Sequence, residues 1–205
     1  MNKFLPIFCL VLFSVIILPS HNRHEKKIIF LKKVQVEKVD VQKDTCQVHK
    51  NILIGDSQTP FVDWGSENFE LISKVGSKKS LWLGGQSLSW LLTALKEYKV
   101  DVCVSNVGIC IGTNGGFNKK RDDISGLISE IKNKFPNANL YVIQGSWGWG
   151  GVSNKTETQV RNYYKVFDSL GVKVVEPPIG KIEPHGRKPI YKIIGQNLDS
   201  LIKNN

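Results

Sequence analysis

Residues 51–59 read Asn-Ile-Leu-Ile-Gly-Asp-Ser-Gln-Thr, a short apolar run that ends at a glycine and continues in polar side chains. The run 51–54 is typical of a buried β-strand, and the glycine and polar residues after it are typical of a turn. The same succession of apolar strand, polar or glycine-rich turn and helix recurs along the rest of the chain. The stretch therefore predicts the first unit of an alternating α/β domain.

Ten elements are expected after residue 50. The expected strands are 51–54, 80–83, 100–111, 140–144 and 172–175, and the expected helices are 66–75, 87–98, 122–135, 156–170 and 189–202. Alternating strands and helices require right-handed crossovers, so we predict a mostly parallel five-stranded sheet with helices on both faces. In such a sheet the active crevice lies at the carboxyl ends of the strands.

Length and composition restrict the class of protein. The chain has 205 residues, which suffice for one α/β domain with an N-terminal extension but not for two such domains. Hydrophobic residues at 41% and charged residues at 22% exclude wholesale disorder, a fibrous repeat and a polytopic membrane protein. Of the net charge of +10, residues 1–50 hold +5, so the excess is concentrated in the extension. This distribution argues against a basic groove, and no nucleic-acid partner is expected.

The N-terminal extension has the pattern of a secretory signal, because Lys3 precedes an almost wholly apolar run at 4–18. This run is shorter than the about 20 residues of a membrane-spanning helix, so a cleaved signal peptide and a signal anchor are both open. Leu18-Pro19-Ser20 is a poor cleavage site and favours an anchor. We predict a signal peptide or signal anchor at 1–20, a basic stem at 21–50 and the folded domain at 51–205, in an exported or membrane-anchored protein.

Cysteine usage gives no sign of a structural framework. With Cys9 in the apolar segment, Cys46, Cys103 and Cys110 form an odd set without a Cys-x-x-Cys pair. We therefore expect neither a zinc site nor a disulfide framework, and we interpret Cys103 and Cys110 as small buried side chains. No metal and no organic cofactor is expected.

The loops after four of the five expected strands contain residues that suit acyl transfer. These residues are Ser57, the pair Gly84-Gly85, Asn114 and His185, the only histidine outside residues 1–50. A serine hydroxyl needs a base to become nucleophilic, and a tetrahedral oxyanion needs donors such as backbone N–H groups or an asparagine amide. Singly, each residue could serve a cap, a tight turn or a surface loop, but together they favour a catalytic site.

The loop after the fourth expected strand, residues 145–151, carries Trp147 and Trp149 between glycines. Flat aromatic side chains on an exposed loop suit sugar rings or acyl chains, so we predict that both tryptophans line the substrate crevice. The alternative is that one of them covers the edge of the core.

These blocks, in this order, resemble those of the SGNH/GDSL hydrolase superfamily of esterases and lipases over residues 51–205. Residues 54–57, Ile-Gly-Asp-Ser, are similar to the block of the nucleophile, which implies Ser57. The resemblance further implies Gly85 and Asn114 as oxyanion-hole residues and His185 as the base. It also implies a flavodoxin-like three-layer α/β/α sandwich and the hydrolysis of carboxylic esters. With export and the tryptophan loop, a carbohydrate or cell-envelope ester is the expected substrate.

One departure concerns the acid of the triad. The family's last block is Asp-x-x-His, and Ile182 occupies the Asp position. Glu183 is one candidate to orient the imidazole, Glu176 is a second, and a backbone carbonyl is a third. We favour the carbonyl, because an extended segment before Pro184 is expected to direct the Glu183 side chain away from the ring. Loss of the acid leaves an alternative function, a catalytically impaired module that binds glycans or has a structural role.

Overall fold

The computed structural model describes residues 49–72, 80–100, 103–175 and 180–203. The chain divides into two units, 1–43 and 44–205, and every described residue belongs to the second. The predicted signal at 1–20, most of the predicted stem and Cys46 lie outside the described residues. Within the described part of the chain, no helix has the length and apolar character needed to cross a membrane.

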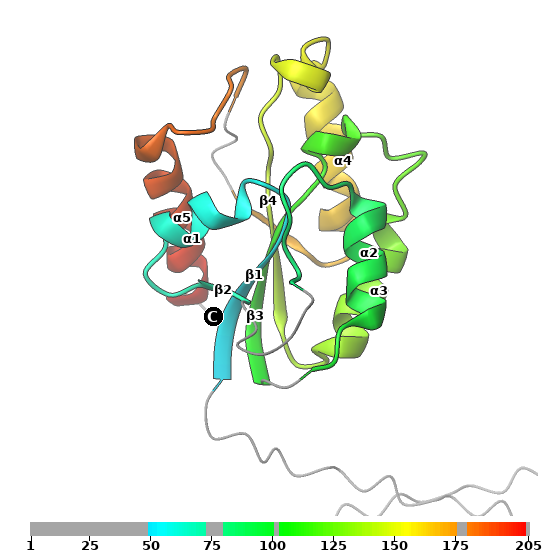
Figure 1. Cartoon of the computed structure of the whole chain (residues 1–205), viewed down its shortest axis with the longest axis vertical. Helices are drawn as coiled ribbons and strands as arrows, with labels where there is room; N and C mark the ends of the chain where they lie inside the picture. The colour runs from blue at the N-terminus through cyan, green and yellow to red at the C-terminus, as the bar shows by residue number, and fades with distance from the viewer. Residues whose placement is uncertain (1–48, 73–79, 101–102, 176–179, 204–205) are drawn as a thin grey trace, which may run out of the picture. The chain divides into compact units, whose positions relative to one another are not determined.

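A five-stranded parallel sheet forms the centre of the domain (Figure 1). Its strands are β1 (His49–Gly55), β2 (Glu70–Leu71), β3 (Cys103–Cys110), β4 (Asn139–Ile143) and β5 (Lys173–Val175). They are arranged in the order β2-β1-β3-β4-β5, the doubly wound order of flavodoxin-like folds. The predicted three-layer α/β/α sandwich is confirmed, and every strand pair is parallel.

Helices cover both faces of the sheet. They are α1 (Thr59–Gly65), α2 (Leu88–Glu97), α3 (Ile124–Lys134), α4 (Glu157–Ser169) and α5 (Lys188–Lys203), with short 3₁₀ turns η1 (Thr113–Gly115) and η2 (Gly150–Val152). Helices α1 and α5 lie on one side and α2 and α3 on the other (Figure 1). Each face of the sheet has its own hydrophobic core, and successive side chains of β1 point into one core and then the other. Ile52 and Ile54 pack with α2, α3 and α4, and Leu53 packs with α1 and α5.

The region between β1 and α2 differs from the prediction. The helix predicted over 66–75 is wrong, because Ser66 is the C-cap of the unpredicted helix α1 and residues 70–71 form β2. The Ser66 hydroxyl donates to Asp199 of α5 and accepts from the Phe69 N–H, so it stabilises a turn and does not begin a helix. In place of the strand predicted over 80–83, the structure has a single β-bridge between Gly55 and Trp82. This bridge lies on the side of β1 that pairs with β2.

One of the two described cysteines differs from the prediction. Cys110 is a free, buried thiol, as expected. Cys103 is part-buried and disulfide-bonded, so its interpretation as a small buried thiol is wrong.

Helices α1 and α5 cross at two glycines, which allow their backbones to touch. A Cβ on Gly195 would lie 2.1 Å from the carbonyl carbon of Gly65, and a Cβ on Gly65 would lie 2.1 Å from the Tyr191 carbonyl oxygen. A side chain at either position would have to separate the helices.

We therefore expect Gly195→Ala to lower the free energy of unfolding by about 1–3 kcal/mol, the usual cost of overpacking. Urea denaturation measures the change. Gly151→Ala is the matched control, because its Cβ would meet no atom within 4 Å, and it should change stability by less than about 0.5 kcal/mol. Equal midpoints for the two variants would contradict the close helix contact.

Candidate active site

Ser57 lies in the turn between β1 and α1, at the carboxyl edge of the sheet. The preceding Gly55 has a φ of +134°, and a Cβ at this position would lie 1.9 Å from the Cys110 carbonyl oxygen. Glycine is therefore required here, because no L side chain fits this conformation and this distance. The Asp56 N–H donates to the same carbonyl at 2.8 Å, which fixes the start of the Ser57 turn against the end of β3.

His185 reaches Ser57 from the loop between β5 and α5. The Ser57 Oγ lies 3.0 Å from the His185 Nε2, although the two residues are 128 positions apart in sequence. A turn places the ring, with the Arg187 N–H donating to the Pro184 carbonyl at 2.9 Å and Gly186 at a φ of +77°. The structure thus brings together the serine and the histidine that the sequence predicted as a pair.

Glu183 contacts the other side of the imidazole. Its Oε1 lies 2.5 Å from the His185 Nδ1 and accepts the His185 backbone N–H at 2.8 Å. The expectation that this side chain points away from the ring is wrong, because the chain turns at 184–187 and the carboxylate folds back over that turn. A carboxylate at Nδ1 favours the tautomer whose Nε2 accepts the proton of a serine hydroxyl.

The alternatives to Glu183 were Glu176 and a backbone carbonyl, and the group at the His185 Nδ1 is the Glu183 carboxylate and not the carbonyl that we favoured. Ile182, at the family's acid position, is part-buried and packs against the core between the sheet and α5. Glu176, the second candidate acid, lies outside the described residues.

Aromatic side chains hold the His185 ring on two sides. Trp149 contacts it edge to face with centroids 5.4 Å apart, and Phe61 of α1 contacts it at 5.6 Å. The Trp149 Nε1 donates to the Ser146 Oγ at 2.8 Å, which fixes the indole. The sequence did not indicate Phe61, because the helix that carries it was not predicted.

The two tryptophans of the 145–151 loop have different environments. Trp147 is only 7% exposed and belongs to the hydrophobic core, so the prediction that it presents an open face to substrate is wrong. Trp149 is part-buried beside His185, and its contact with substrate stays a prediction.

The predicted oxyanion residues lie at the same edge of the sheet. Asn114 is exposed on η1, and its Nδ2 donates to the Gln86 carbonyl at 3.1 Å and to the Asp56 Oδ2 at 3.5 Å. Gly84 lies beside the nucleophile, since a Cβ on it would be 3.6 Å from the Ser57 Cβ. Gly85 is exposed, with a φ of +74° and no atom within 4 Å of its Cβ position. The role of Gly85 and Asn114 as oxyanion donors stays a prediction.

Asp56 is a site residue that sequence reasoning missed. It is fully buried, and its carboxylate accepts the Gln58 N–H at 3.0 Å and the Asn114 amide. Burial raises the pKa of Asp56 to about 7, an effect that the Gln58 N–H partly opposes. Its position directly before Ser57 in the recognised block was the available signal. Within the described residues, no group of three His, Cys, Asp or Glu side chains could hold a metal ion.

Comparison with known proteins gives structural neighbours only. The chain matches no protein-family model, and no curated protein sequence matches it significantly. Its fold is similar to that of a protein from Streptococcus pneumonia provisionally described as a platelet activating factor (TM-score 0.54, 15% identity, 78% of this chain and 86% of that chain covered). It is also similar to a member of the lipolytic protein G-D-S-L family from Veillonella parvula DSM 2008 (TM-score 0.52, 14% identity, 77% and 100% covered). These similarities confirm the three-layer α/β/α fold that the resemblance predicted.

The buried Asp56 should make stability depend on pH. The folded protein keeps the Asp56 proton up to about pH 7, whereas an unperturbed aspartate has a pKa of 3.8. Folding therefore takes up a proton between these values, and stability falls as the pH rises through them. We expect the free energy of unfolding to decrease by up to about 4 kcal/mol from this group between about pH 4 and pH 8.

Asp56→Asn removes the titrating group but keeps an oxygen that accepts the Gln58 N–H, so it should abolish this part of the pH dependence. Urea denaturation of both proteins over the same pH series measures it. Parallel stability profiles for the two proteins would show that Asp56 titrates normally.

Proposed function

We propose that this protein is a serine ester hydrolase in which Ser57 is the nucleophile and His185 is the general base. The observation that carries the proposal is the continuous set of contacts from the Ser57 Oγ to the His185 Nε2 and from the His185 Nδ1 to Glu183. This is the order of nucleophile, base and orienting acid that acyl transfer requires. The structural neighbour of the lipolytic G-D-S-L family supports the same chemistry.

In the first step, the Ser57 Oγ attacks the ester carbonyl carbon while its proton passes to the His185 Nε2. The Glu183 carboxylate stabilises the imidazolium that forms. The imidazolium then gives the proton to the leaving alkoxide, and the alcohol departs from the acyl-enzyme. Water then attacks the acyl carbon while its proton passes to the same Nε2. The bond from the acyl carbon to the Ser57 Oγ breaks, the imidazolium returns the proton to this oxygen, and the carboxylic acid leaves.

The oxyanion of each tetrahedral intermediate needs donors that are in place before the reaction. We assign this role to the Ser57 N–H, the Gly85 N–H and the Asn114 amide. The Asn114 amide lies at the edge of the sheet where Ser57 lies, and its Nδ2 contacts the Gln86 carbonyl at 3.1 Å and the Asp56 Oδ2 at 3.5 Å. Because an amide has only two N–H donors, Asn114 exchanges the longer of these contacts for the oxyanion in this assignment. In this mechanism Asp56 is a positioning residue.

The substrate that we propose is a carbohydrate or cell-envelope ester, with the protein exported or anchored to a membrane through residues 1–20. Trp149 beside His185 supplies an aromatic edge for a sugar or acyl group. A disulfide-bonded Cys103 agrees with an oxidising compartment. Cell fractionation tests the location: the full chain should appear with membranes or in the exported fraction, and recovery of the intact chain in the cytosol would refute it.

A fluorophosphonate probe tests the nucleophile, because it reacts with activated serines. We expect the wild-type protein to be labelled, Ser57→Ala to be unlabelled and His185→Ala to react much more slowly. Ser125→Ala, on the exposed face of α3, is the control and should be labelled like the wild type. A wild-type protein that binds glycans but takes no label would instead support the non-catalytic module.

Glu183 can be tested separately from the nucleophile. We expect Glu183→Gln to reduce kcat on a small acetyl ester by about 10²- to 10⁴-fold with little change in KM, because the carboxylate acts on the imidazole and not on the substrate. Glu67→Gln replaces an exposed acid away from the ring and should retain wild-type kcat. A kcat near wild type in Glu183→Gln would show that another group orients His185.

A further inference from the structure

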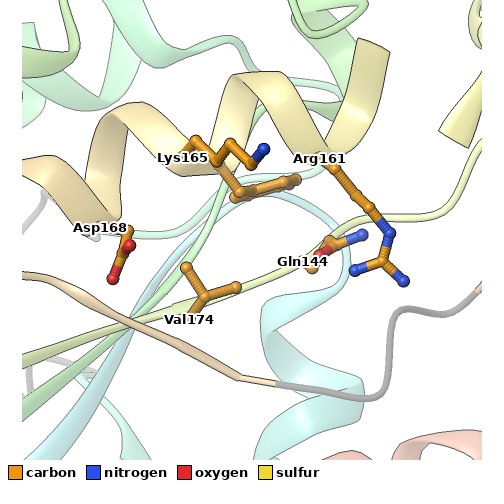
Figure 2. A pocket seen from close by; sticks show the side chains of 6 residues that line it. Gln144, Arg161, Lys165, Asp168 and Val174 are labelled. Atoms are coloured by element: carbon orange, nitrogen blue, oxygen red, sulfur yellow. The ribbon is translucent and has the colours of Figure 1, made fainter. Parts of the chain in front are cut away.

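A pocket between helix α4 and the sheet contains none of the residues assigned to catalysis. It has a volume of about 290 Å³. It is lined by Gln144, Arg161, Tyr164, Lys165, Asp168 and Val174 (Figure 2). The size is close to the lower limit of pockets that hold small molecules, about 300 Å³.

Gln144 is the unusual member of this lining. Its side chain is 2% exposed, and its Nε2 has no hydrogen-bond partner. Buried amide nitrogens are almost always paired, because an unmade hydrogen bond in the interior costs free energy. Figure 2 shows this nitrogen directed to the side of the pocket where Arg161 lies.

The backbone next to Gln144 is held in place. The Gly145 N–H donates to the Tyr164 Oη at 2.9 Å, and this hydroxyl in turn donates to the Ile111 carbonyl at 2.7 Å. The tyrosine hydroxyl thus accepts from one backbone group and donates to another, and it holds the chain directly after Gln144 against α4.

Two cationic side chains line the pocket together with the amide. Arg161 and Lys165 lie one helical turn apart on α4, and guanidinium and ammonium groups only donate hydrogen bonds. The Nε of Arg161 donates to the exposed Glu157 carboxylate at 2.7 Å, so one negative charge already lies beside this guanidinium. Asp168 places one carboxylate at the other end of the pocket (Figure 2). An extended polyanion would meet this charge, whereas a compact anion beside Gln144 would not.

We propose that this pocket binds a small oxyanion, a carboxylate or a phosphate, whose oxygens accept from the Gln144 amide, Arg161 and Lys165. The two ligands share the required chemistry, namely several acceptor oxygens on one negatively charged group. The site is independent of the proposed esterase activity, because it uses no residue of the Ser57 centre. The loop that leads from Gln144 to Trp149 connects it to that centre.

Thermal unfolding of the purified full-length chain tests the proposal. Sodium phosphate and sodium acetate are titrated separately at constant pH and ionic strength, and the midpoint temperature is recorded. At least one anion should raise the midpoint in a saturable manner, since a ligand that binds only the folded state stabilises it. The anion with the lower dissociation constant identifies the ligand as phosphate or carboxylate.

Two variants assign the effect to the pocket. Lys165→Gln removes an exposed cation, and Gln144→Glu replaces the donor by an acceptor; each should raise the dissociation constant at least about tenfold. Lys192→Gln, an exposed lysine on α5, makes the same charge change away from the pocket and should bind like the wild type. Absence of a saturable shift with both anions, or equal dissociation constants for wild type and Lys165→Gln, would overturn the proposal even if Gln144→Glu does not fold.

Discussion

The close contact between the ends of β1 and β3 is the constraint on which the site depends. Gly55 lies against the Cys110 carbonyl at a distance that no side chain permits, and the next N–H donates to that carbonyl. The turns that follow β1 and β3 therefore begin side by side at the carboxyl edge of the sheet. A second bond, from the Gln58 Nε2 to the Thr113 Oγ1 at 3.0 Å, joins these turns again. Ser57 and Asn114 lie at one edge because of these contacts and the parallel register.

Helix α1 links this constraint to the position of His185. It begins two residues after Ser57, and its Phe61 contacts both the His185 ring at 5.6 Å and the Tyr191 ring at 5.0 Å. The glycine contact with α5 fixes the helix that directly follows the His185 loop. A short helix thus connects Ser57, His185 and the last helix, so packing between α1 and α5 also sets the distance between Ser57 and His185.

The sequence predicted the parts of the fold that have strong local periodicity. Helices α2, α3 and α4 were found because apolar residues recur along one face over ten or more residues. Helix α1 has only seven residues, too few for a clear period, although Pro60 in its first turn was a usable signal. Ser66 was misread as a helix start because its actual partner, Asp199, is 133 positions away. Such partners are set by tertiary packing and leave no local pattern.

The site shows the same division between local pattern and tertiary packing. Ser57, Asn114 and His185 were found because strand ends of a parallel sheet converge on one edge. The full burial of Trp147 and the partial burial of Trp149 could not be predicted separately, because both belong to one glycine-rich loop and their burial depends on the core beneath it. Asp56 was passed over because nothing in the sequence states that its carboxylate is buried.

The position of Glu183 explains how the chain keeps an acid at the imidazole without the family's Asp-x-x-His spacing. Glutamate is one methylene longer than aspartate, and the turn at 184–187 lets its carboxylate bind both the backbone N–H and the Nδ1 of His185. Ile182, one residue earlier, packs into the core and anchors the loop. Ile182 thus anchors the loop in the core, and the adjacent Glu183 supplies the carboxylate at the imidazole. Because Glu183 and His185 belong to one turn, a movement of the loop would carry them together and leave the contact between them intact.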